Sequence, residues 1–382
     1  MIIQKQSELA DFCEKLAENP YLTIDTEFLR DKTYYSRLCL IQMAGPGIEA
    51  AAIDPIEFDL DLTPFWELML DKSTMKVFHA ARQDLEIFYQ EIDALPAPIF
   101  DTQVAAMVCG YGDSIAYNAL VKNVTGTELA KSAQFTDWSR RPLSGKQLSY
   151  ALDDVIHLRG VYESLQKQLA KRKRENWVFE EMEILTSTDT YKMDPQDAWK
   201  RIKIRSDKPK VLSVLKALAA WREEDARTRN VPRGRILRDD TLADLALYLP
   251  KNTDGLLRIR SLPKDMAKGR VGKILLELIE KAKNAPEDQM PKRPRREPLP
   301  ASAQPALEML KLLLKINCSE EGVATKLVAT KDDLEILATE KNPDSRALKG
   351  WRKDIFGQDA LAMLSGDLSL TLKDGTIKKV YS

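Results

Sequence analysis

The apolar pattern of the chain changes near residue 209, and this change limits the folds that the chain can adopt. Before it, short apolar runs typical of strands lie at 21–28, 38–43, 48–53 and 75–78, with amphipathic stretches typical of helices between and after them. After it, the apolar residues follow a helical period. The pattern therefore predicts an α/β layered unit followed by helical units.

The predicted helices keep this division. We expect helices near 64–70, 83–92, 102–108, 144–173 and 175–185 in the first half, and at 209–230, 241–248 and 270–283 in the second. Asp374-Gly375, between alternating residues, predicts a hairpin over 370–377. A chain of 382 residues is too long for one core. We expect domains at 1–190, 205–285 and 305–382, joined by a linker at 286–304, since 284–305 holds six of the 19 prolines.

The formal net charge of zero is a cancellation between the two halves. Residues 1–190 hold 19 Lys and Arg against 30 Asp and Glu, a net charge of −11, and residues 191–382 hold 39 against 28, a net of +11. An acidic unit joined to a basic one leaves a nucleic-acid partner open for the basic half.

The sequence also indicates where the protein acts. It has no apolar segment of about twenty residues that would span a membrane, and its N-terminus lacks a secretory leader. The four cysteines form no CxxC motif, so neither a zinc site nor a disulfide framework is indicated. We therefore expect a cytoplasmic protein with no membrane partner.

Two carboxylates lie two residues apart in the first apolar strand. Side chains at i and i+2 of a strand share a face, so Asp25 and Glu27 point the same way. Two like charges side by side are unfavourable unless a cation lies between them. For this motif alone, a solvated outer face remains an alternative.

Two later segments add acidic groups. Asp84 follows the strand at 75–78 and stands at a helix start, where a carboxylate is also a common cap. In the helix from 144, Tyr150 and Asp154 are spaced i,i+4 and share a face. The order Asp-x-Glu, then Asp, then Tyr-x-x-x-Asp indicates one site rather than three unrelated features.

In this order of motifs the chain resembles the DEDD superfamily of 3′→5′ exonucleases, in the branch that ends on Tyr-x-x-x-Asp. The segments 33–42, 78–88, 100–103 and 137–143 are similar to bacterial ribonuclease D. The segments 218–227 and 231–235 resemble the helicase-and-RNase-D C-terminal (HRDC) domain, and residues 305–382 resemble it loosely. The resemblance implies a ribonuclease H-like exonuclease domain with a mixed sheet and flanking helices, followed by two small all-α HRDC-type domains.

The resemblance also implies a metal site. Asp25, Glu27, Asp84 and Asp154 would hold two divalent cations, and oxygen ligands favour Mg²⁺ or Mn²⁺. Tyr150, whose reference pKa is near 10, would orient the attacking water rather than deprotonate it. These five residues form the predicted catalytic set.

Four further residues are candidates for contact with the substrate. Phe28 follows the first motif and His79 opens the second, and each has a structural alternative, as a core aromatic or as a histidine hydrogen-bonded at a strand end. Arg233 and Arg235, expected in a loop, fit contacts to phosphates. HRDC domains also occur in helicases, but no GxxxxGK[ST] phosphate loop is present, so we expect no NTP.

Together these features predict a metal-dependent 3′→5′ exoribonuclease that releases 5′-mononucleotides and trims tRNA precursors. Two alternatives remain open from the residues alone. One is a DNA 3′→5′ exonuclease with the same site, because discrimination of RNA depends on contacts to the 2′-hydroxyl. The other is a non-catalytic RNA-binding scaffold, although clustered negative charge would not help a scaffold to bind phosphate.

Overall fold

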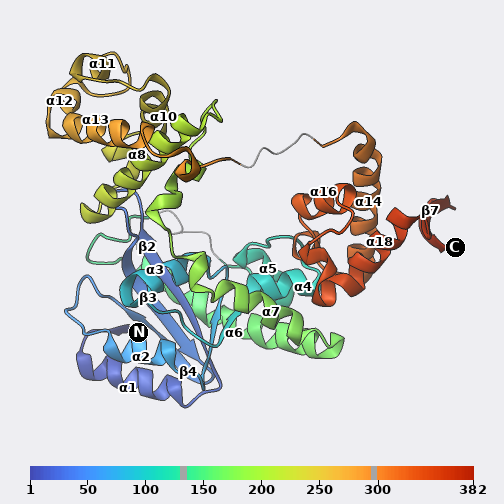
Figure 1. Cartoon of the computed structure of the whole chain (residues 1–382). Helices are drawn as coiled ribbons and strands as arrows, with labels where there is room; N and C mark the ends of the chain where they lie inside the picture. Colours follow the sequence, from blue (N-terminus) through green and yellow to red (C-terminus); the bar gives the residue numbers. More distant parts are fainter. Residues whose placement is uncertain (130–135, 294–298) are drawn as a thin grey trace.

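The computed structural model describes residues 1–129, 136–293 and 299–382. An α/β unit carries the N-terminus, and two helical units stand at different places on it (Figure 1). The middle unit lies beyond the end of β2 (Tyr21–Leu29), and the last unit lies beside α4 (Thr102–Cys109) and α5 (Tyr117–Thr125). The predicted division into an α/β part and helical parts is confirmed.

The α/β unit is built on a six-stranded mixed sheet in the order β1-β4-β3-β2-β5-β6. The strand β2 pairs antiparallel with β3 (Arg37–Gly45), which pairs antiparallel with β4 (Ile48–Ile53). On its other side β2 pairs parallel with β5 (Met75–Phe78). The outer strands β1 (Ile2–Ile3) and β6 (Ile99–Asp101) are too short to give a strand pattern, and the sequence did not predict them.

Helices cover both faces of this sheet. On one face lie α1 (Gln6–Ala17), α2 (Thr63–Leu70) and α3 (Arg82–Ile92), whose apolar residues join the main core. On the other face α6 (Gly145–Arg172) crosses β2, β3 and β4. The long helix continues into α7 (Glu175–Leu185), and the bounds of both agree closely with the prediction.

The middle unit has a separate core. Its elements are η2 (Pro195–Arg201), α8 (Pro209–Thr228), α9 (Arg233–Ile236), α10 (Asp239–Tyr248), α11 (Thr253–Leu257), α12 (Lys264–Lys268) and α13 (Arg270–Lys283). Apolar residues between Ala198 and Ala282 pack into one cluster, which includes Trp199 from the short turn before α8. In the described residues, the short 3₁₀ turn η1 (Thr188–Thr190) lies between α7 and the middle unit. Two further 3₁₀ turns, η3 (Glu287–Gln289) and η4 (Ala301–Ala303), follow the middle unit.

The last unit is mainly helical and ends in the predicted hairpin. Its elements are α14 (Gln304–Glu321), α15 (Thr325–Val328), α16 (Lys331–Thr339), η5 (Arg346–Leu348), α17 (Gly350–Arg352), η6 (Lys353–Gly357), α18 (Gln358–Ser365), β7 (Leu368–Lys373) and β8 (Thr376–Tyr381). Its apolar residues belong to the same core cluster as those of the α/β unit. Trp177 and Trp351 stack with ring centroids 4.4 Å apart, so the last unit is packed against α7.

None of the helices in the described part of the chain is long and apolar enough to cross a membrane.

Candidate active site

The strand β2 carries the first two carboxylates onto the face that α6 covers. Asp25 lies opposite Gln42 of β3, and Glu27 lies opposite Leu40. The hydroxyl of Thr23, two residues before Asp25, donates 2.8 Å to the backbone carbonyl of Val155 on α6. This contact holds α6 against the face of β2 that bears both carboxylates. Asp25 and Glu27 share this face, as the two-residue period of a strand predicted.

Asp84 reaches the same region from the first turn of α3. The chain enters this helix through Ala80, whose φ is 59°, and the amides of Ala80 and Ala81 donate to the carboxylate of Asp101 at 3.0 and 2.9 Å. Asp101 also caps α4 by accepting from the amides of Gln103 and Val104. The hydroxyl of Thr26 donates to Asp84, so this carboxylate is held from β2 rather than serving as a helix cap.

The helix α6 supplies the last two residues. It begins with a capping box, in which Ser144 and Gln147 bond reciprocally, and its buried residues Ala151 and Val155 face the sheet. Tyr150 and Asp154 lie beside this apolar stripe and line the same cleft as Asp25 and Glu27 of β2. The i,i+4 spacing thus brings both into the site.

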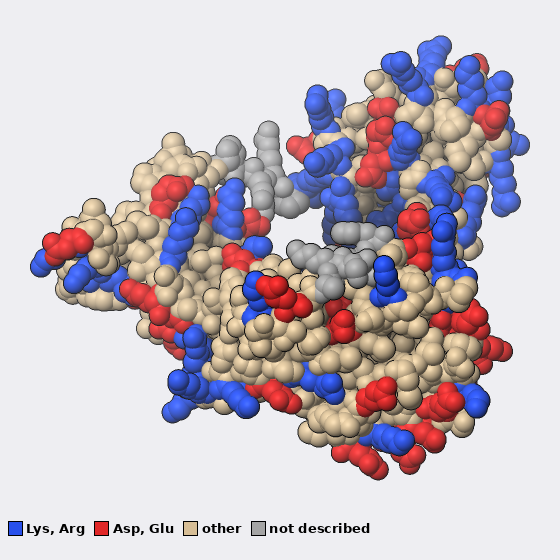
Figure 2. Space-filling model, turned by 180° about the vertical axis from the view of Figure 1, so that it is seen from behind, with Lys and Arg blue, Asp and Glu red and all other residues tan. Residues whose placement is uncertain are grey.

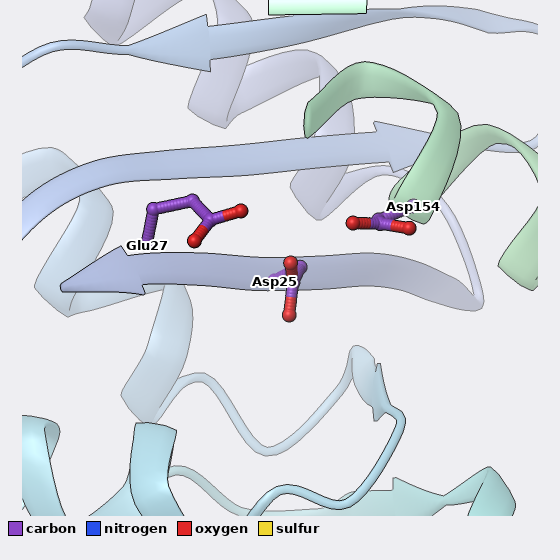
Figure 3. Close-up of side chains that lie close together, drawn as sticks. All are labelled: Asp25, Glu27 and Asp154. Carbon is purple, nitrogen blue, oxygen red and sulfur yellow. The ribbon is translucent and has the colours of Figure 1, made fainter. Parts of the chain in front are cut away.

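Side-chain oxygens of Asp25, Glu27 and Asp154 lie within 4.8 Å of one another (Figure 3). These three carboxylates, with Phe28, His79, Asp84 and Tyr150, line one cleft of about 520 Å³. The structure therefore brings together all five predicted catalytic residues and two of the four predicted substrate contacts.

The carboxylates of the cleft repel one another. Burial and then the charge of Asp154 raise the pKa of Asp25 to about 8. Burial and then its acidic neighbours, Asp25 first, raise the pKa of Glu27 to about 9. Burial and then Asp153 raise the pKa of Asp154 to about 7, and burial followed by Asp25 raises the pKa of Asp84 well above its ordinary value.

These carboxylates fit a divalent cation. Within the described ranges, no Lys or Arg forms an ion pair with any of the four. Grouped acidic oxygens without a basic partner are the ligands that Mg²⁺ and Mn²⁺ prefer. A cation would offset the mutual repulsion that, after burial, raises the pKa values of Asp25, Glu27 and Asp84.

Tyr117 also lines the cleft, and no pattern in the sequence indicated it. Its hydroxyl donates 2.5 Å to the backbone carbonyl of Asp154, and its ring lies 5.4 Å from that of His79. His79 in turn bonds through Nδ1 to Thr102, 2.9 Å away, and burial lowers its pKa. His79 is thus held by neighbours as well as facing the cleft.

Arg233 and Arg235 lie outside the cleft, in the middle unit. They belong to the short helix α9, whose N-cap residue is Pro232, so the expectation of a loop was wrong. Arg233 lies 3.6 Å from the buried carboxylate of Glu223 and over the ring of Tyr34. Arg235 is exposed.

Two family models match the chain. The model described as a 3′-5′ exonuclease matches residues 1–170, and the HRDC domain model matches residues 211–279. The ribonuclease D of Nitrobacter hamburgensis is 46% identical and that of Granulibacter bethesdensis 44% identical, over 99% of this chain and 99% and 96% of the relatives. The chain belongs to the ribonuclease D family. It is a 3′→5′ exoribonuclease, a hydrolase whose family uses divalent metal ions.

A solved structure agrees with this assignment. The ribonuclease D of Escherichia coli, described as an exoribonuclease involved in structured RNA processing, superposes with a TM-score of 0.82 and 28% identity, over 96% of this chain and 98% of that one. The likeness therefore extends over all three units of ribonuclease D. The catalytic core of RRP6 from Trypanosoma brucei, with a TM-score of 0.54 and 20% identity, shares the fold.

Proposed function

We propose that Asp25, Glu27, Asp84 and Asp154 hold two divalent cations, Mg²⁺ or Mn²⁺, at which this exoribonuclease cleaves the 3′-terminal phosphodiester and releases a 5′-mononucleotide. The observation that carries the proposal is the convergence of three carboxylates within 4.8 Å, with the fourth in the same cleft. When bound, such a cation pair supplies Lewis-acid stabilisation of the attacking and leaving oxygens.

Tyr150 is the residue that we assign to the attacking water. Burial, followed by the charges of Asp154, Glu27 and Asp25, raises the pKa of Tyr150. The phenol therefore keeps its proton near neutral pH and acts as a hydrogen-bonding group that orients water, rather than as a general base.

The terminal nucleotide would lie against Phe28 and His79, which line the same cleft as Asp84. Phe28 is half-buried at the edge of the cleft, and stacking of a base on an aromatic ring contributes about 1–3 kcal/mol. Because such stacking tolerates every base, it suits an enzyme that removes successive nucleotides regardless of sequence.

The middle unit would bind the body of the RNA. Figure 2 shows Lys and Arg gathered on it. Its exposed basic residues include Arg229, Arg235, Arg238, Arg258, Arg260, Lys264, Lys268, Arg270 and Lys273. Contacts of this kind bind phosphates with little sequence choice. We assign Arg235 to this surface, and Arg233 to its base beside Tyr34.

We propose tRNA precursors with 3′ extensions as substrates in the cytoplasm. The E. coli relative's description as an enzyme of structured RNA processing supports a folded substrate with a free 3′ end. For the domains, we propose an exonuclease domain at 1–190, an HRDC domain at 205–285, a linker at 286–304 and an HRDC-like domain at 305–382. The separate cluster of the middle unit supports the second of these.

The test uses 3′-labelled precursor tRNA and matched single-stranded DNA, each with Mg²⁺ or with EDTA. We expect metal-dependent release of mononucleotides from the RNA and its loss in Asp84→Ala. Asp11→Asn, on an exposed position of α1, is the matched control and should keep full activity. Equal degradation of RNA and DNA would favour the DNA exonuclease, and full activity in EDTA would contradict the metal site.

A further inference from the structure

Gln42 on β3 is a buried side chain whose polar atoms have no partner. It is 0% exposed, and neither its Oε1 nor its Nε2 has a hydrogen-bond partner in the part of the chain that the structure describes. Buried polar groups in native proteins are nearly always hydrogen-bonded, and a side-chain amide with two unpaired groups lowers stability. An apolar residue at position 42 would therefore make the folded protein more stable. The presence of an amide there calls for a functional explanation.

The sheet register places Gln42 beside the carboxylate cluster. Gln42 lies directly opposite Asp25 in the β2–β3 pair. The side chains of directly opposite residues in an antiparallel pair project from the same face, with Cβ atoms about 4.5–5.5 Å apart. On its other side Gln42 lies opposite Ala52, whose methyl group offers no hydrogen bond.

The helix α6 covers Gln42 with apolar residues. Ala151 packs in a small cluster with Leu40 and Ala52, and Val155, one turn later, packs with Ala44. Gln42 lies between Leu40 and Ala44 on β3, under the turn of α6 that presents Asp154.

The hydroxyl of Thr23, two residues before Asp25 on the same face of β2, already has partners. It bonds to the carbonyls of Ala44 and Val155, at 3.2 and 2.8 Å. The carboxylate of Asp25, directly opposite Gln42 in the sheet register, is the polar side chain that the amide can meet.

We propose that Gln42 is a positioning residue for the metal-binding carboxylates. Its amide donates to the carboxylate of Asp25, directly or through one buried water, when the cluster holds metal. This inference rests on the proposed function, because it assigns Asp25 as a metal ligand. A neutral amide suits the task, since it holds a carboxylate in one orientation without adding charge that would repel a cation or a phosphate.

The main test is Gln42→Met, which keeps the length of the side chain and removes both polar groups. The unfolding temperature of the metal-free variant should be about 2–4 °C higher than that of metal-free wild type, because the variant lacks the two unpaired buried groups. The Mn²⁺ concentration that half-saturates the protein, followed by electron paramagnetic resonance of free Mn²⁺, should rise about 10-fold, as for other residues that hold metal ligands. A variant that is more stable but binds metal less tightly is what a positioning role predicts.

Thr74→Val is the matched control in the same α/β unit. It removes a buried hydroxyl that donates 3.2 Å to the backbone carbonyl of Ala17 and does not line the cleft, so it should lower the unfolding temperature and leave the Mn²⁺ concentration for half-saturation within about twofold. Loss of Mn²⁺ affinity in both variants would mean that any disturbance of the α/β unit weakens the site, and it would overturn the specific role of Gln42.

The outcomes separate this inference from the proposed function. If wild type binds Mn²⁺ and Gln42→Met binds it equally well, the inference is overturned and the metal site stands. If wild type does not bind Mn²⁺, or if Asp25→Asn binds Mn²⁺ as well as wild type does, the proposed metal site is wrong and so is the inference. Should Gln42→Met not fold, a crystal structure of wild type with Mn²⁺ decides. An amide bonded to Asp25, or to a water on Asp25, supports the role, and an amide bonded to backbone groups alone overturns it.

Discussion

The hydroxyl of Tyr117, from α5, donates a hydrogen bond of 2.5 Å to the backbone carbonyl of Asp154 on α6. It therefore connects a helix at the edge of the cleft to the turn that presents a predicted metal ligand. Burial, followed by the charges of Asp154 and Asp25, raises the pKa of Tyr117, so this phenol is a permanent donor.

Tyr117→Phe should slow catalysis without weakening RNA binding. Loss of one hydrogen bond costs about 0.5–1.5 kcal/mol of stability and frees the turn that carries Asp154. We expect kcat to fall about 10-fold, because small displacements of catalytic groups are costly, while KM changes less than twofold. Steady-state kinetics on a labelled oligoribonucleotide measure this, and an equal loss in KM would place Tyr117 in substrate binding instead.

The acidic cluster predicts how metal-free stability depends on pH. The pKa values of Asp25, Glu27 and Asp154 are raised in the folded protein to about 8, 9 and 7. The folded state therefore binds more protons than the unfolded state from about pH 4 upward, so these groups lower stability as the pH rises from about 4 to 9.

In EDTA, thermal unfolding of wild type should thus occur at lower temperature at pH 8 than at pH 5. Asp25→Asn should flatten this slope, because it removes one charge and relieves Glu27. Mg²⁺ should stabilise wild type more at pH 8 than at pH 5, since metal binds the deprotonated carboxylates. A metal-free unfolding temperature that rises over this range, by the same amount in both proteins, would contradict the account.

Tyr34 connects the loop after β2 to the middle unit. Its hydroxyl donates to Glu223, which is 0% exposed, and accepts from Nε of Arg227 at 3.0 Å. The backbone amides of Tyr34 and Tyr35 both donate to the side-chain oxygen of Asn230 at 3.1 Å. These bonds hold the basic unit at a set position relative to the cleft.

Tyr34→Phe should therefore weaken binding of long RNA alone. Each hydrogen bond to a charged group contributes about 1.5–3 kcal/mol to stability, so loss of these bonds loosens the contact between the loop and the middle unit. We therefore expect KM to rise about threefold or more for an RNA long enough to reach the middle unit. A trinucleotide, which meets the cleft only, should keep its KM and kcat. Equal effects on both substrates would show that Tyr34 acts on the cleft itself.

Arg352 connects the last unit to α7 of the α/β unit through a buried ion pair. It is 6% exposed, bonds to the carbonyl of Leu327 at 2.8 Å, and pairs with Glu181, which is 8% exposed. Arg352→Met leaves Glu181 buried without this partner, which should cost about 3–5 kcal/mol in unfolding by denaturant.

The double variant Arg352→Met with Glu181→Gln should recover most of that loss, because the unpaired charge is gone. As a control, Lys200→Met breaks an exposed pair with Asp197 and should cost less than about 1 kcal/mol. If Arg352→Met were as mild as this control, the last unit would not depend on the buried pair.

The sequence predicted those parts of the site that depend on local periodicity. Asp25 and Glu27 share a face because strand side chains alternate, and Tyr150 and Asp154 share a face because a helix repeats every 3.6 residues. Both rules hold in any tertiary context. Tyr117 could not be found this way, because its bond to a backbone carbonyl depends on how α5 meets α6 and leaves no pattern in the sequence.

The packing of the last unit against the α/β unit could not be predicted from the sequence either. A proline-rich stretch predicted a separate unit, yet Arg174 pairs with Glu321 at 2.6 Å across 147 positions, and Trp177 stacks on Trp351. Arg233 shows the same limit. Its contacts with a buried carboxylate from another helix and with the ring of Tyr34 leave no pattern in the sequence.

The exonuclease activity of Asp154→Asn shows whether the carboxylate cluster is the catalytic metal site. The substitution keeps the size of the side chain and removes one ligand charge from the group within 4.8 Å. With Mg²⁺ and a 3′-labelled RNA, we predict that kcat falls by about 10³-fold or more, as expected when electrostatic stabilisation of the transition state is lost. Activity within about fivefold of wild type, in a folded variant, would contradict the account.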